Sequence, residues 1–161
     1  MRSSTPSSLK STDGMKKRLN RDQMLMGLAH VAAARGTCNR LSVGAVLAFE
    51  ARPISLGYNG APSGMPHCGA DCGPGKPCKN TIHAEDNAIR WARSFLGTNP
   101  TGATLYVTDS PCLECAEKVW KAGVSRVVYD REYRITDGIE FLIKKGIEVS
   151  QCHVDLAISA N

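Results

Sequence analysis

The feature that most constrains this chain is a histidine and a glutamate followed far downstream by two cysteines. His83 and Glu85 are separated by one alanine, and Cys112 and Cys115 form a Pro-Cys-x-x-Cys run. One imidazole and two thiolates are three good zinc ligands, the number that a catalytic zinc takes when its fourth position is kept for water. The fold must therefore bring two distant segments to one point.

Glu85 lies close to His83 without being needed as a ligand, so its carboxylate is available for proton transfer. A lone Cys-x-x-Cys would favour a structural zinc or a redox pair, but the upstream His-x-Glu and the proline before Cys112 argue against both. Helices are expected to begin at His83 and after Cys112. Their positive N-terminal ends favour thiolates at Cys112 and Cys115.

The length of 161 residues predicts one domain with a sizeable core. Residues 1–18 are interpreted as a disordered basic leader and residues 19–161 as a single domain. No apolar run approaches the roughly 20 residues that span a bilayer, and residues 1–17 lack the apolar region of a secretory signal. The expectation is a cytoplasmic protein with no membrane partner.

The net charge of +5 belongs to the N-terminal segment. Residues 1–21 hold six Lys or Arg and one acid, whereas residues 22–161 hold 14 basic and 14 acidic residues. Recognition of a polynucleotide normally requires a basic face on the folded part, with aromatic residues for stacking. A nucleic-acid partner is therefore not expected.

Hydrophobic periodicity predicts alternating helices and strands. Helices are expected over 21–35, 83–95, 113–122 and 136–145, and strands over 43–49, 53–57, 103–108, 126–129 and 147–151. The first two strands read as a hairpin. The later alternation of strand and helix predicts an α/β fold with parallel crossovers and helices covering a sheet.

Longer stretches of the sequence resemble one known family, the deoxycytidylate (dCMP) deaminases of phages and bacteria. His-x-Glu followed by Pro-Cys-x-x-Cys is an established signature of zinc-dependent nucleobase deaminases and is recognised here as such. The Gly-Tyr-Asn-Gly-x-Pro stretch narrows the resemblance to the dCMP branch of the cytidine deaminase superfamily. The similarity runs from about residue 20 to 151, and the segments that carry it are 43–46, 57–64, 83–89, 104–108, 110–115, 122–124 and 127–129.

The resemblance implies a three-layer α/β/α fold with a five-stranded mixed sheet and the hydrolytic deamination of dCMP to dUMP. It also implies that Asn59 hydrogen-bonds the deoxyribose and that Ser110 and Tyr129 line the nucleotide pocket. The backbone N–H of Ala84 could orient the base. In the reaction, hydroxide attacks C4 of cytosine while Glu85 moves protons to ring nitrogen N3 and to the departing ammonia.

The resemblance implies that the protein, if phage-encoded, acts in the host cytoplasm. Members of this family are often hexamers that dCTP activates and dTTP inhibits. The resemblance therefore implies a homo-oligomer, hexamer or dimer, with dCTP and dTTP as possible effectors near the Gly-Tyr-Asn-Gly loop. Alternative substrates remain open: dCTP, a 5-modified dCMP or, as a different class, a polynucleotide such as tRNA or single-stranded DNA. A zinc-stabilised binding module without catalytic activity is a further alternative. It requires that Glu85 has no role in proton transfer.

Four further cysteines predict a second, structural zinc: Cys38, Cys68, Cys72 and Cys78, with His67 as a possible substitute for one of them. Cys38 and Cys68 occupy positions that resemble zinc-ligand positions of some phage dCMP deaminases. Such a site would order the long Gly- and Pro-rich loop between residues 58 and 81. The alternative is a set of free or packed cysteines.

Two acids depart from the family pattern. Asp86 follows Glu85 directly and is expected to raise the proton affinity of Glu85, since like charges disfavour ionisation. Asp109 places a negative charge near the expected path of a phosphate, which leaves the phosphorylation state of the substrate open. The candidates for phosphate contacts are Arg40, Arg90, Arg93, Arg131 and Arg134.

Overall fold

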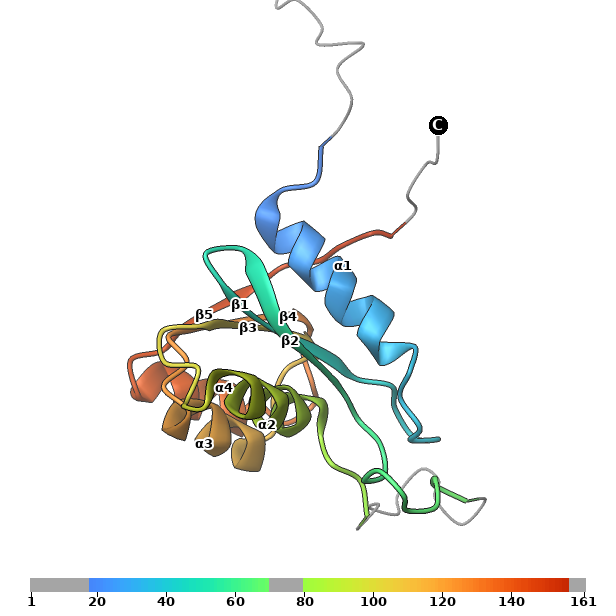
Figure 1. Cartoon of the computed structure of the whole chain (residues 1–161). Coiled ribbons are helices and arrows are strands. Elements are labelled where there is room, and N and C mark those ends of the chain that lie inside the picture. The colour runs from blue at the N-terminus through green and yellow to red at the C-terminus, as the bar shows by residue number, and fades with distance from the viewer. Residues whose placement is uncertain (1–17, 70–79, 157–161) are drawn as a thin grey trace, which may run out of the picture.

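A five-stranded sheet separates one helix from the other three (Figure 1). This computed structural model describes residues 18–69 and 80–156, so the predicted leader lies outside the described residues except for Arg18. No helix within those two ranges is long and apolar enough to span a bilayer. The elements are α1 (Arg21–Ala33), β1 (Gly44–Phe49), β2 (Arg52–Tyr58), α2 (Ala84–Leu96), β3 (Thr104–Asp109), α3 (Leu113–Lys121), β4 (Arg126–Arg131), α4 (Asp137–Lys144) and β5 (Glu148–Gln151).

The strand order in the sheet is β2-β1-β3-β4-β5. β1 pairs antiparallel with both β2 and β3, whereas β3, β4 and β5 are parallel. The turn between β1 and β2 has positive φ angles at Glu50 and Ala51, 45° and 66°, as a two-residue hairpin with right-handed twist requires. The predicted hairpin, the parallel crossovers and the mixed sheet are thus confirmed.

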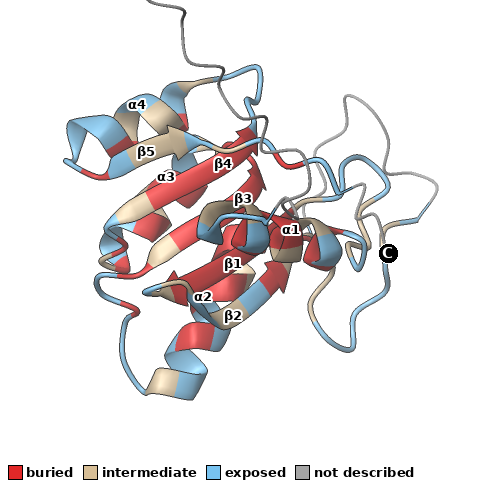
Figure 2. Cartoon of the chain, turned by 90° about the horizontal axis from the view of Figure 1, so that it is seen from above, coloured by how far each residue is buried: buried red, intermediate tan, exposed pale blue. Residues whose placement is uncertain are grey.

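Alternating residues of the central strands enter two separate cores, because side chains of a strand point to opposite faces in turn. Leu47, Leu105 and Val127 pack on the side of α2, α3 and α4, while the neighbouring Tyr106 and Val128 pack on the side of α1. Figure 2 shows β1, β3 and β4 buried along most of their length and the edge strands β2 and β5 more exposed. The predicted α/β/α layering follows from this division.

Polar contacts fasten α1 to the sheet. Asn20 caps the helix through a capping box with Gln23. Asp22 accepts hydrogen bonds from both terminal nitrogens of Arg126, at 2.9 and 2.8 Å, and from the hydroxyl of Tyr106 at 2.7 Å. α1 therefore depends on buried or half-buried charge as well as on apolar packing.

A second polar contact to α1 forms around Asp130, whose side chain is 3% exposed. Nε2 of His30 lies 2.6 Å from one Asp130 oxygen, and Nδ1 of His153 lies 2.8 Å from the other. One carboxylate of β4 thus joins α1 to the segment after β5. His30 is a packing histidine with a hydrogen-bond partner.

Helix α2 approaches the sheet at a position where only glycine fits. A Cβ atom on Gly57 of β2 would overlap the carbonyl oxygen of Ala84 and the backbone nitrogen of Ala88. The missing side chain lets the first turn of α2 lie directly on the strand. This contact sets the position of the helix end that carries His83 and Glu85.

Candidate active site

The two halves of the sequence motif meet because they stand at neighbouring helix N-termini. His83 is the N-cap residue of α2 and Cys112 is the N-cap residue of α3, both with extended backbone. α3 begins beyond the carboxyl end of β3, the edge at which α/β proteins commonly bind ligands. α2 packs beside it. The predicted helix starts are confirmed.

The geometry of the three expected ligands fits zinc. Nδ1 of His83 lies 3.2 Å from Sγ of Cys115 and 3.7 Å from Sγ of Cys112, and the three ligand atoms lie within 4.8 Å of one another. Tetrahedral zinc with bonds of about 2.0 Å to nitrogen and about 2.3 Å to sulfur separates such atoms by about 3.5 to 3.8 Å. No other such group occurs within residues 18–69 and 80–156.

The donor set carries the charge that a divalent cation prefers. Hydrogen bonding from Cys115, and then from His83, lowers the pKa of Cys112 to about 4. The hydrogen bond to Cys112 raises the pKa of His83 to about 9, and the same partner, together with burial, raises the pKa of Cys115. The lowered pKa favours the thiolate expected at Cys112, whereas the raised pKa keeps Cys115 protonated, contrary to the thiolate expected there. A cation among the three would take the place of the protons that the donor atoms hold.

Glu85 is held in the first turn of α2 with 4% of its surface exposed. Burial is the main cause that raises its pKa, to about 7, and the positive charge of His83 opposes the shift. The expectation that Asp86 causes this shift is wrong. Asp86 receives hydrogen bonds from Arg90 at 3.0 Å and from Lys118 at 2.9 Å, and these cations hold its own pKa low.

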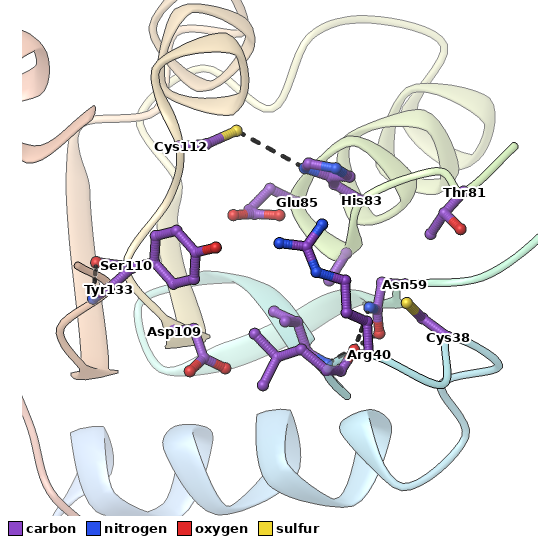
Figure 3. Close-up of a pocket in the computed structure, with 13 residues that line it drawn as sticks. Cys38, Arg40, Asn59, Thr81, His83, Glu85, Asp109, Ser110, Cys112 and Tyr133 are labelled. Atoms are coloured by element: carbon purple, nitrogen blue, oxygen red, sulfur yellow. Dashed lines mark hydrogen bonds between the residues drawn. The ribbon is translucent and has the colours of Figure 1, made fainter. Parts of the chain in front are cut away.

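A cavity of about 290 Å³ opens over this cluster (Figure 3). Its walls come from the loop after α1, the end of β2, the start of α2 and the segments after β3 and β4. Such a volume is near the lower end for small-molecule sites. The lining residues are Cys38, Arg40, Leu41, Val43, Asn59, Thr81, His83, Ala84, Glu85, Asp109, Ser110, Cys112 and Tyr133.

The sequence comparison identifies the family. Residues 19–131 match the family model described as the cytidine and deoxycytidylate deaminase zinc-binding region. The chain belongs to this family. The match includes the three candidate ligands and Glu85, so the zinc-binding character predicted from the motif is supported by both geometry and family.

Several relatives of this deaminase align with most of its length. ComE operon protein 2 of Bacillus subtilis is 38% identical over 143 residues, which are 86% of this chain and 75% of that protein. Deoxycytidylate deaminase of Mycobacterium phage D29 is 37% identical over 125 residues, 69% of this chain and 94% of that one. The crystal structure of dCMP deaminase from cyanophage S-TIM5, in complex with dCMP and dUMP, matches with a TM-score of 0.71 and 34% identity over 79% of this chain and 93% of that chain. The cytidine-deaminase-like fold is thereby confirmed.

Most of the residues predicted for substrate binding lie at the cavity of this deaminase. Asn59, Ala84 and Ser110 line it, whereas Tyr129 does not. Tyr129 is 8% exposed and its hydroxyl lies 3.5 Å from Glu132. Tyr133 takes the place at the wall, because Oγ of Ser110 accepts a hydrogen bond from its backbone nitrogen at 2.7 Å. In the sequence, Tyr133 follows shortly after the predicted strand 126–129, and this position was the signal that could have placed it at the cavity.

The second cysteine group is only partly described. Cys72 and Cys78 lie outside the described residues. Cys38 lines the catalytic cavity, and Sγ of Cys68 lies 3.5 Å from the hydroxyl oxygen of Thr81. The side-chain nitrogen of Asn39 donates to the carbonyl oxygen of Cys68 at 3.3 Å, which joins the two loops. The second zinc remains a prediction.

Proposed function

We propose that this deaminase converts dCMP and water to dUMP and ammonia. The observation that carries the proposal is the position of Glu85, a buried carboxyl group beside the His83, Cys112 and Cys115 ligand set at the base of a cavity. The similarity to a phage dCMP deaminase bound to dCMP and dUMP supports the choice of nucleotide. The reaction exchanges the amino group on C4 for oxygen.

The residues of the chain that would hold the metal are His83, Cys112 and Cys115, whose donor atoms fit zinc in type and spacing. When bound there, zinc lowers the pKa of a water molecule so that hydroxide is available at neutral pH. The buried position of Cys115 and the packing of both helix ends keep the donor atoms fixed.

Glu85 carries the protons. A carboxyl group whose pKa is about 7 is found in both protonation states near neutral pH, so it can accept a proton and return it. In the forward reaction it takes the proton of the attacking water and delivers it to N3 of cytosine. It then takes the second proton of that water from the oxygen now bonded to C4 and gives it to the amino group, which leaves as ammonia as the C4 carbonyl forms. Both proton transfers of the hydrolysis therefore pass through Glu85.

The cavity residues offer the remaining contacts. Ala84 is the first residue of α2, where backbone N–H groups have no partner within the helix, and we assign its N–H to the base. Asn59 accepts from Val43 N and donates to Leu41 O, which leaves one amide hydrogen for the deoxyribose. Ser110 accepts from Tyr133, so its own hydroxyl hydrogen can point to the nucleotide.

We further propose a structural zinc held by Cys38, Cys68, Cys72 and Cys78, with His67 as a possible substitute. The hydrogen bonds from Asn39 to the carbonyl oxygens of Cys68 and Gly69, both at 3.3 Å, support it because they join the segments that carry two of these ligands. Metal analysis of the purified protein should give two zinc ions per chain. One zinc per chain, with the catalytic ligands intact, would contradict the second site.

Regulation by dCTP and dTTP in a homo-oligomer is a proposal of the same kind. A second cavity of about 560 Å³ lies beside the Gly60–Met65 loop and is walled by Arg35, Tyr58 and Trp91. The Arg35 guanidinium lies 5.9 Å from the centre of the Tyr58 ring. A cation, an aromatic ring and a loop backbone suit a nucleotide with several phosphates. Light scattering with and without dCTP would measure the assembly.

The substrate is tested by ammonia release from deoxycytidine, dCMP, dCTP and CMP, each with and without dCTP or dTTP as effector. The zinc-loaded protein should give the highest kcat/KM with dCMP. A Glu85→Gln preparation, purified in parallel, controls for contaminating deaminases. Faster turnover of dCTP, or turnover of none of the four nucleotides, would overturn the proposal.

A further inference from the structure

A charged contact joins the two halves of the metal motif one helical turn behind the ligands. Nζ of Lys118 on α3 donates to Oδ2 of Asp86 on α2 at 2.9 Å. Asp86 is three residues after His83, and Lys118 is three residues after Cys115. Because positions three apart share one face of a helix, the helix faces that carry these ligands also carry the ion pair.

The carboxylate of Asp86 is held in the orientation that this contact needs. Its side chain is 12% exposed. The guanidinium group of Arg90, which the sequence offered for phosphate binding, donates to both of its oxygens, at 3.0 and 3.3 Å. This two-point contact within α2 fixes the plane of the carboxylate. The carboxylate is therefore already ordered where it accepts from Lys118 of the other helix.

The ammonium group of Lys118 has a second carboxylate partner, which differs in exposure. Oε1 of Glu114, four residues earlier on α3, also accepts at 2.9 Å, but the Glu114 side chain is 74% exposed. Exposed ion pairs contribute little, because water and salt screen the charges. The pair with Asp86 is the better shielded of the two, and it is the one that joins two helices.

The apolar packing of these helices leaves a restraint for the ion pair to supply. α2 adds mainly alanines to the core that it shares with α3, namely Ala84, Ala88 and Ala92. Such short side chains bring helices close together, but each has a single carbon that can interlock with a neighbour. A charged hydrogen bond prefers one distance and direction, so it also limits how far one helix end shifts against the other.

We propose that the Lys118–Asp86 ion pair positions the first turn of α2 against α3, and so keeps Glu85 and the three ligands in the geometry that zinc and the reaction need. Lys118 is a positioning residue, because it does not line the cavity and acts through Asp86. The kinetic part of this inference rests on the proposed function. Its zinc-binding part requires only the ligand set.

Lys118→Met tests the positioning role, because it removes the ammonium group and keeps an unbranched side chain. We define the catalytic zinc as the zinc that a Cys112→Ala preparation lacks. It should pass to a chelator about 10-fold faster, as expected when a contact behind metal ligands is lost. With zinc in excess, kcat for dCMP should fall about three- to tenfold. KM should stay within about twofold, since Lys118 does not line the cavity.

A double variant tests whether the two residues act on each other. Lys118→Met combined with Asp86→Asn should lose zinc no faster than the faster of the two single variants, within about twofold. Effects that multiply would show that the residues act independently, and this would overturn the proposal.

Lys118→Arg tests whether the charge is the property that matters. It keeps a cation of similar reach, so zinc loss should stay within about threefold of the wild-type rate. Zinc loss as fast as in Lys118→Met would contradict a role for the ion pair.

Two controls change charges on α3 and leave the pair with Asp86 in place. Glu114→Gln removes the exposed partner of Lys118, and Lys121→Met removes an exposed lysine in the last turn of the helix. Both variants should retain zinc and kcat. Zinc loss from either control as fast as from Lys118→Met would mean that any charge change on α3 has this effect, and it would overturn the proposal.

The measurements also separate this proposal from a purely structural role and from the proposed function. A structural role for Lys118 predicts a lower free energy of unfolding with unchanged zinc loss and kcat in Lys118→Met, and that result overturns the positioning role. If the wild type fails to deaminate dCMP, the proposed function fails. The comparison of zinc loss still decides the role of Lys118 in that case.

Discussion

The two faces of the sheet are built differently and do different work. The face covered by α2, α3 and α4 is packed with alanine and branched aliphatic side chains, and its helix N-termini carry His83, Glu85 and Cys112. The face covered by α1 has fewer apolar contacts and adds ionic ones, around Asp22 and Asp130. Close apolar packing holds the donor atoms in place, whereas the charged contacts attach the helix that covers the other side.

This difference predicts that substitutions separate into two groups. Changes at the α2–α3 helix ends should abolish metal binding or chemistry in a protein that still folds. Changes under α1 should lower the free energy of unfolding in a protein that still turns over substrate. Five single substitutions test this division.

The largest effect is expected for Cys112→Ala. Removal of one of three protein ligands should leave zinc weakly bound and activity undetectable, because zinc sites depend on the full donor set. Zinc content by mass spectrometry and ammonia release from dCMP measure both. Cys152→Ala is the matched control: this cysteine packs half-buried on the α1 side and its loss should leave zinc and activity in place. Loss of zinc from both variants would contradict the division between the metal-binding face and the α1 face.

Glu85→Gln should lower kcat by about 10²- to 10⁴-fold with zinc retained, since a positioned acid–base group contributes factors of this size. The amide keeps the shape of the side chain but cannot exchange protons with the substrate. Glu114→Gln, an exposed acid in the first turn of α3 that pairs with Lys118, is the control and should change kcat little. An unchanged kcat in Glu85→Gln would show that the carboxyl group is idle.

Gly138→Ala should affect zinc binding from outside the metal site. A Cβ on Gly138 at the start of α4 would overlap the carbonyl oxygen of Pro111 and crowd the backbone of Cys112. We expect a loss of about 1 to 3 kcal/mol in the free energy of unfolding, together with weaker zinc retention against a chelator. Gly69→Ala, where the added carbon meets open space, should change neither. Equal zinc retention in both glycine variants would mean that the backbone at Pro111 and Cys112 shifts to accommodate the added carbon without disturbing the ligands.

Under α1, Asp130→Asn should lower the free energy of unfolding by about 1 to 3 kcal/mol, because His30 and His153 lose a buried charged acceptor. Its kcat should stay within about twofold of the wild type, since neither histidine lines the cavity. Urea unfolding and steady-state kinetics measure the two quantities. A large fall in kcat at full stability would show that the α1 face also positions the active site.

The sequence predicted the parts of this molecule that depend on local pattern. The order of the elements followed from hydrophobic periodicity, and the placement of His83 and Cys112 followed because each stands at a helix start that can be recognised locally. The strand order β2-β1-β3-β4-β5 could not be read in this way, because the pairing of β1 with β3 joins segments far apart in the chain.

Residues at the rim of the cavity could not be predicted from the sequence either, because distant contacts place them there. Tyr133 lies at the wall because Ser110, a distant residue, fixes its backbone. Asp86 stands next to Glu85 in sequence, yet its partners are Arg90 and Lys118. Adjacency in sequence predicted a repulsion that the helix geometry removes, since neighbouring residues on a helix point in different directions.

The smallest effect is expected for Asp22→Asn, where the charge is only partly buried. Hydrogen bonds from Arg126 hold the pKa of Asp22 below its ordinary value of 3.8. A carboxyl group with a lowered pKa in the folded state stabilises the protein above its unfolded pKa and loses that contribution as the pH falls through the folded value. The variant should therefore be less stable than wild type by about 1 kcal/mol at pH 7.

The same difference should shrink below about pH 4, when the wild-type carboxyl group takes up a proton. Urea unfolding at pH 7, 5 and 3 measures it, and kcat at pH 7 should be unchanged. A stability difference that stays constant from pH 7 to 3 would mean that the neutral hydrogen bonds of Asp22, not its charge, attach α1 to the sheet. The α1 face would then resemble the catalytic face more closely, with packing and neutral contacts holding both.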